Sequence, residues 1–145
     1  MKLVLANDHA AVDMKFEMKA YLEDLGHEVI DIGAQDTTPC DYPEFGVRAG
    51  EMVASGEVDG GVLICATGIG LSVAANKVKG VRAAVCSEPV SARLAKEHNH
   101  ANMIAFGARI VGRETAKAIL DAWLDAEYLG GRHQARVDQI DAIME

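Results

Sequence analysis

The chain of 145 residues is 50% hydrophobic and 25% charged, a balance typical of globular proteins, so we expect one domain, 1–145, with a sizeable core. Its net charge of −8, with no basic stripe to offset it, argues against nucleic acid as a partner. The start of the chain reaches charge too soon for a signal peptide, and no apolar run approaches the roughly 18 residues that span a bilayer. Cys40, Cys65 and Cys86 form neither a disulfide framework nor a zinc pattern, which favours a reducing cytoplasm.

Short apolar runs alternate with segments of helical spacing. The expected strands are 3–6, 29–32, 62–64, 81–85 and 103–106, and the expected helices are about 11–25, 44–54, 71–77, 88–97, 113–127 and 134–144. This alternation predicts a Rossmann-like, three-layer α/β domain: a five-stranded parallel sheet covered on both faces, with a C-terminal helical extension. In such sheets ligands bind outside the carboxyl ends of the strands.

The stretch around Cys65 places a thiol between the end of a strand and the start of a helix. Thr67, Gly68 and Gly70 break the chain before the helix. Free amides and the helix dipole at that point would favour a thiolate and stabilise an oxyanion beside it. The alternative is a cysteine that only packs, followed by glycines of an ordinary turn. The stretch has neither the third glycine of a dinucleotide site nor the ending of a P-loop.

Polar residues at other strand and helix ends have two interpretations each. Asp8 and His9 follow the first strand, where they would bind a substrate hydroxyl or transfer a proton, or Asp8 would simply cap the first helix. His98 is either a proton-transfer group or part of a solvated helix end. No carboxylate or cysteine falls at ligand spacing among His9, His98 and His100, so we expect no metal site.

The end of this acidic chain is basic. Arg132 and Arg136 follow Gly130-Gly131 and are four residues apart, so they share one face if the segment is helical. Two guanidinium groups in that arrangement suit a phosphate dianion, while a solvated tail is the alternative.

Several short motifs occur together in a fixed order. They are D-H, D-Y-P, C-x-T-G-x-G with A-A-N-K, C-S-E-P, H-N, N-x-x-x-F-G-x-R and G-G-R-H-x-x-R. In this combination the chain resembles the ribose-5-phosphate isomerase B family, with its allose-6-phosphate and galactose-6-phosphate isomerases, from Asp8 to Arg136. The family usually has glycine where this chain has Ala66, and a methyl group there would narrow the loop or alter substrate fit. The sequence around D-H also differs from the glycine-rich sequence usual in the family, with Ala6-Asn7 before it and Ala10-Ala11 after it.

The resemblance implies an aldose–ketose isomerase of pentose phosphate metabolism. Such an enzyme interconverts ribose 5-phosphate and ribulose 5-phosphate, or a closely related pair, through an enediolate and without a metal or cofactor. Cys65 would move a proton between C2 and C1, and Thr67 would assist proton movement between the oxygens. His98 would open the furanose ring, with Asp8 binding hydroxyls nearby.

The resemblance also implies a set of substrate contacts. Those to the sugar and its oxyanion are Asp8, Tyr42, Asn99 and the amides of Gly68, Gly70, Leu71 and Ser72. Those to the phosphate are His9, Arg109, Arg132 and Arg136. In this family the two arginines of the tail, 131–145, reach the neighbouring subunit, which implies a homodimer or a dimer of dimers with shared active sites.

Two other classes of function remain as alternatives. A non-catalytic phosphate- or nucleotide-binding module would not need a reactive Cys65 or His98. Alkylation of the Cys65 thiol, and its protection by a sugar phosphate, would distinguish an isomerase from such a module. A thiol phosphatase or redox enzyme would need Cys-x5-Arg or C-x-x-C, and neither occurs. The sequence leaves open which sugar phosphate is the substrate.

Overall fold

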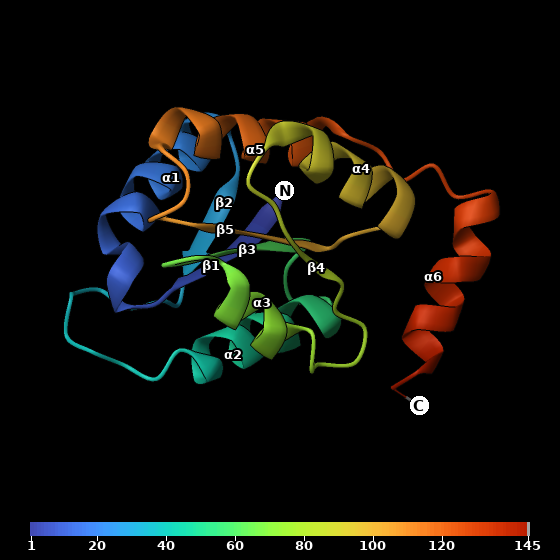
Figure 1. Ribbon diagram of the computed structural model, residues 1–145, viewed down its shortest axis with the longest axis horizontal. Coiled ribbons are helices and arrows are strands. Elements are labelled where there is room, and N and C mark those ends of the chain that lie inside the picture. The colour runs from blue at the N-terminus through green and yellow to red at the C-terminus, as the bar shows by residue number, and fades with distance from the viewer. Residues whose placement is uncertain (145) are drawn as a thin grey trace.

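A five-stranded parallel sheet forms the centre of the computed structural model, which describes residues 1–144 (Figure 1). Its strands are β1 (Lys2–Asn7), β2 (Glu28–Asp31), β3 (Gly60–Cys65), β4 (Ala83–Val85) and β5 (Met103–Gly107). They lie in the order β2-β1-β3-β5-β4, so the order reverses between β1 and β3. The predicted sheet is confirmed, and the expected elements match to within two residues at each end.

Helices cover both faces of the sheet, which explains why β3 and β5 are buried and apolar along their whole length. Those on one face are α1 (Val12–Asp24), α4 (Pro89–Asn99) and α5 (Arg113–Asp125), and those on the other are α2 (Pro43–Ala54) and α3 (Ile69–Ala75). Alternate residues of each strand enter the two cores, so Ile64 packs with the first group while Leu63 and Cys65 pack with the second. A short 3₁₀ turn, η1 (His9–Ala11), precedes α1.

The last helix, α6 (Arg132–Ala142), stands beside the end of α4 and away from the sheet (Figure 1). Gly130 and Gly131 both have positive φ, 62° and 54°, and they turn the chain into this helix. Arg82 binds the carboxylate of Asp141 at 2.9 Å and fixes α6 to the segment before β4. Within residues 1–144, no helix has the length and apolar character that a membrane span requires.

Candidate active site

The turn after β3 holds Cys65 in a defined environment. The side chain is 5% exposed, and the amide of Gly68 donates a hydrogen bond to its Sγ at 3.1 Å. Gly68 has φ of 82°, and a Cβ at this position would stand 2.7 Å from the backbone of Phe106. Only glycine fits both conditions, so the turn and its thiol have one geometry.

The amides from Gly68 to Ser72 divide into two groups. Gly68 donates to the thiol, Ile69 donates to Thr67 Oγ1 at 3.2 Å, and Ser72 donates to the Gly68 carbonyl at 3.2 Å. The amides of Gly70 and Leu71 have no protein acceptor among residues 1–144, as expected in a first helical turn. These two amides are therefore the ones free to stabilise a negative oxygen.

Asp8 and His9 lie next to this turn because β1 and β3 are neighbours, with Asn7 opposite Ile64. Asp8 is 7% exposed and its Oδ1 accepts a hydrogen bond from the Ala10 amide at 3.0 Å, so Asp8 caps the 3₁₀ turn η1, while hydroxyl binding stays a prediction. His9 accepts a hydrogen bond on Nδ1 from the Cys40 amide at 3.2 Å. In the neutral ring the proton therefore lies on Nε2, which is left as a donor. The role of Cys40 has no sequence signal, since a backbone group performs it.

Tyr42 and Arg109 complete this edge of the sheet. The ring of Tyr42 lies over Gly70, where a Cβ would stand 2.8 Å from Cε2. The Arg109 amide donates to the Ala66 carbonyl at 3.0 Å, which places this exposed residue beside the Cys65 turn. The structure thus brings the residues after β1, β3 and β5 together with Tyr42 of the second loop.

His98 and Asn99 do not join this group within one chain. They end α4, and β5 begins four residues after Asn99, so they lie on the side of the sheet where strands start. Six-residue β3 alone separates the two edges by about 16 Å, at roughly 3.3 Å per residue. His98 therefore lies far from Asp8 of the same chain, because successive elements of an α/β chain alternate between the two edges, and its role in ring opening stays a prediction.

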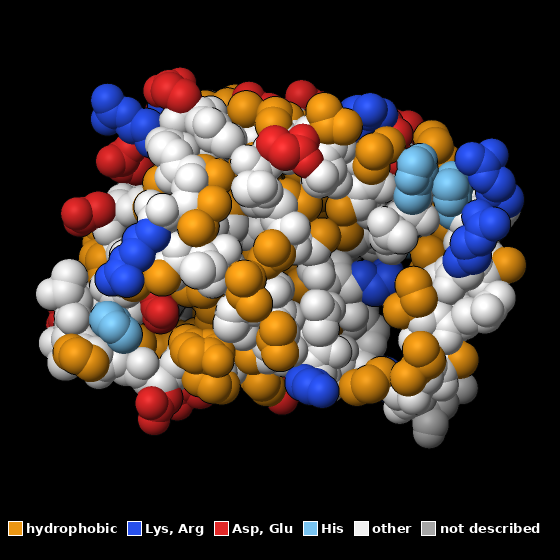
Figure 2. Space-filling view, viewed as in Figure 1, with side chains coloured by type: hydrophobic (Ala, Val, Ile, Leu, Met, Phe, Trp, Pro, Cys, Tyr) orange, Lys and Arg blue, Asp and Glu red, His pale blue; other side chains and the backbone are white. Residues whose placement is uncertain are grey.

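His98 instead forms a second cluster with α6. Its ring stacks on that of His133, with centroids 4.5 Å apart and an interplanar angle of 13°. Arg132 and Arg136 are exposed on the same helix. In Figure 2 histidine and basic side chains gather over α6 and the adjacent end of α4. Sequence reasoning gave His133 no role, although it lies between the two arginines in G-G-R-H-x-x-R.

The environment of His133 makes the free energy of unfolding depend on pH. Burial, with the charges of His98, Arg132 and Arg136, lowers its pKa from the ordinary 6.5. Below pH 6.5 the unfolded chain therefore binds a proton that the folded chain resists, so stability must fall as the pH falls. Between pH 7.5 and 5.5 we expect the thermal midpoint of His133→Gln to drop less than that of the unsubstituted protein. Equal drops in both proteins would contradict this assignment, since carboxylates titrate alike in both.

Other groups with catalytic potential are less suited to chemistry. Burial and the charge of Glu88 raise the pKa of Cys86 to about 11, so it stays a thiol at neutral pH. No group of three or more His, Cys, Asp or Glu side chains within residues 1–144 is placed to hold a metal ion. That the site works without a metal or cofactor stays a prediction.

Comparison with known proteins agrees with the motifs. The model of the ribose/galactose isomerase family matches residues 3–140. Ribose-5-phosphate isomerase B of Escherichia coli is 53% identical over 98% of this chain and 95% of its own. A galactose-6-phosphate isomerase subunit of Clostridium acetobutylicum is 44% identical over 100% of this chain and 84% of its own. The structure of ribose-5-phosphate isomerase B from Clostridium thermocellum matches with a TM-score of 0.97 at 48% identity, over 99% of this chain and 97% of that one. The chain therefore belongs to the ribose/galactose isomerase family.

Proposed function

We propose that this protein interconverts ribose 5-phosphate and ribulose 5-phosphate in pentose phosphate metabolism. The observation that carries the proposal is the Cys65 thiol, held by the Gly68 amide beside two free amides. Proton abstraction next to a carbonyl needs a base and an electrostatic partner for the enediolate, and this turn supplies both. Three free cysteines suit the reducing cytoplasm, which we infer as the site of action.

The reaction is a balanced exchange of protons within one sugar. The Cys65 thiolate takes the proton from C2 of the open-chain aldose, and the electron pair forms the double bond of the enediolate. The amides of Gly70 and Leu71 hold the negative charge on oxygen, and Thr67 relays a proton between O1 and O2. The thiol then returns its proton to C1, which gives the ketose and restores the thiolate.

Substrate binding uses the groups around that turn. Asp8 keeps its second carboxylate oxygen for sugar hydroxyls, since among residues 1–144 Oδ1 alone accepts a hydrogen bond. The Nε2–H of His9 and the guanidinium of Arg109 bind the phosphate, and Tyr42 lines the sugar site. Phosphate is remote from C1 and C2, so its binding energy orients the reacting carbons.

The remaining residues of the site come from a second copy of the chain. His98, Asn99, Arg132 and Arg136 lie at the edge of the sheet opposite Cys65, so one chain carries two incomplete halves. A twofold symmetric dimer places each half against the complementary half of its partner. His98 would then open the furanose ring bound at the partner's Cys65, and the two arginines would clamp the same phosphate.

Apolar surface supports this association. Ile69 and Val73 of α3 are each 55% exposed, and Val85 and Val90 are 43% and 57% exposed. Figure 2 shows hydrophobic side chains gathered over α3 and β4. A cavity of about 420 Å³ lies between β4 and α6 and is lined in part by Ile140 and Ile143. Contiguous apolar patches typically mark interfaces, and we infer a homodimer or a dimer of dimers.

A panel of five- and six-carbon aldose phosphates, assayed for ketose formation, tests the proposed function. We expect the highest kcat/KM with ribose 5-phosphate, because the relative from Escherichia coli, 53% identical to this chain, is named for that sugar. Ketose formation from only a six-carbon phosphate would replace the substrate and keep the reaction. Tight binding without turnover of any sugar would instead support the phosphate-binding module.

A further inference from the structure

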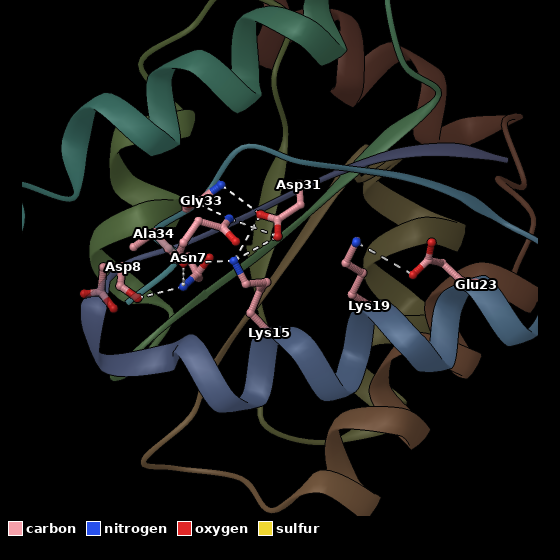
Figure 3. A network of polar contacts seen from close by, with 9 residues as sticks. Asn7, Asp8, Lys15, Lys19, Glu23, Asp31, Gly33 and Ala34 are labelled. Carbon is pink, nitrogen blue, oxygen red and sulfur yellow. Dashed lines mark hydrogen bonds and ion pairs between the residues drawn. The ribbon is translucent and has the colours of Figure 1, made fainter. Parts of the chain in front are cut away.

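Lys15 is a charged side chain on the buried face of α1. It is 0% exposed, a rare position for lysine. Its Nζ lies 2.9 Å from Asp31 Oδ2, at the end of β2, and 2.9 Å from the carbonyl oxygen of Ala34 (Figure 3). A buried ion pair contributes little net stability compared with a well-packed apolar pair. The contact to Ala34 points to what Lys15 does in addition.

Asn7 binds the same carbonyl group from the end of β1. Its Nδ2 donates to the Ala34 oxygen at 3.1 Å and to the Asp8 oxygen at 2.8 Å. These two donations fix the orientation of the amide, because the reverse orientation would set Oδ1 against two carbonyl oxygens. Asn7 is 0% exposed, and a Cβ at Gly33 would collide with its Oδ1. The loop after β2 therefore packs directly on Asn7.

The hydrogen bonds form a continuous path from Lys15 to the sugar-binding edge. Lys15 and Asn7 share the Ala34 carbonyl, Asn7 holds the Asp8 carbonyl, and the Ala34 amide donates to Asn7 O at 3.1 Å. The same loop continues to Cys40, whose amide orients His9. Within residues 1–144, none of these contacts involves the turn from Cys65 to Leu71.

We propose that Lys15 is a positioning residue for sugar recognition, holding Asp8 and the start of the 35–42 loop through Ala34 and Asn7. This inference rests on the proposed isomerase activity. Because the path ends at Asp8 and not at Cys65, loss of Lys15 weakens substrate binding and leaves the proton transfer intact. KM therefore rises by at least about tenfold while kcat stays within about threefold, as displacement of a binding group predicts.

The experiment compares Lys15→Met, Lys15→Met/Asp31→Asn and Lys19→Met. The single variant leaves the carboxylate of Asp31, which is 10% exposed, without its lysine partner, so the thermal midpoint of that variant should fall by about 10 °C. The double variant removes both charges but keeps an oxygen that can accept from the Gly33 amide, which donates to Asp31 Oδ1 at 3.0 Å, so most of that loss should return. Lys19→Met is the matched control: Lys19 lies on the same helix in an exposed pair with Glu23 at 3.9 Å.

All kinetics are measured well below every thermal midpoint, with amide spectra of the ¹⁵N-labelled proteins recorded alongside. A raised KM that persists in the double variant, with Asp8–Ala10 amide signals shifted in it but not in Lys19→Met, is the expected result. If the Lys15–Asp31 pair is purely structural, its loss lowers only the amount of active enzyme. Lys15→Met would then lower kcat and leave KM unchanged, and the double variant would recover kcat. That outcome overturns the proposal. If the unsubstituted protein turns over no sugar phosphate, the proposed function fails, and the Asp8–Ala10 signals decide the positioning role by themselves.

Discussion

Cys65→Ala is expected to lower kcat for isomerisation by about 10²–10⁴-fold, because general bases typically contribute that much. The sulfur of Cys65 is the proposed proton acceptor, which the turn after β3 holds against the Gly68 amide, and alanine has no atom to accept the proton. Residue 65 is 5% exposed, and alanine is a small apolar residue that can occupy this buried position. The thermal midpoint should therefore change little. Turnover of ribose 5-phosphate by the purified variant is the measurement.

Cys86→Ala is the matched control, since Cys86 is also buried but lies outside the site. It should keep more than half of the unsubstituted rate. Calorimetric titration with ribose 5-phosphate should give Cys65→Ala an affinity within a fewfold of the unsubstituted protein, because the phosphate contacts remain. A Cys65→Ala rate above a tenth of the original would exclude Cys65 as the base.

Two inactive variants are expected to restore activity when their subunits mix. In the proposed dimer, Cys65→Ala disables one half of the site, and Arg132→Ala/Arg136→Ala disables the half that would come from the partner. A hybrid dimer then contains one site with both defects and one site with neither. Random exchange makes about half of the dimers hybrid, so roughly a quarter of the sites should be active under twofold symmetry. Turnover of the mixture, with exchange verified by native mass spectrometry, is the measurement.

The structure provides a matched negative control for this experiment. His98 lies on the same half as the two arginines, and its ring contacts His133 between them in α6. Mixing His98→Ala with Arg132→Ala/Arg136→Ala should restore nothing, because every hybrid site then carries one defect. If Cys65→Ala also fails to complement the arginine variant once exchange is verified, the arginines act within their own subunit or have no role.

Local patterns in the sequence determined the elements of the fold and their class. Apolar runs such as 62–64 predict strands buried on both faces, and alternation with helical segments leaves a parallel sheet as the favoured arrangement. The position of Cys65 at a strand end next to glycines followed from the same reasoning, since it depends on residues adjacent in the chain. The motifs then carried the family assignment, which the comparisons confirm.

Tertiary structure alone decided which of these residues meet. His98 precedes β5 whereas Cys65 ends β3, and only the course of the strands shows that this places them on opposite edges of the sheet. Lys15 has the same spacing on α1 as the buried residues Val12, Met18 and Leu22, so helical periodicity places it on the buried face. Its partners Asp31 and Ala34 belong to β2 and the loop after it, and periodicity within α1 does not identify them. The Cys40 amide on His9 leaves no sequence pattern, because every residue except proline carries a backbone N–H. Spacing along a chain determines which face of an element a residue occupies, whereas contacts between elements depend on packing that sequence periodicity does not contain.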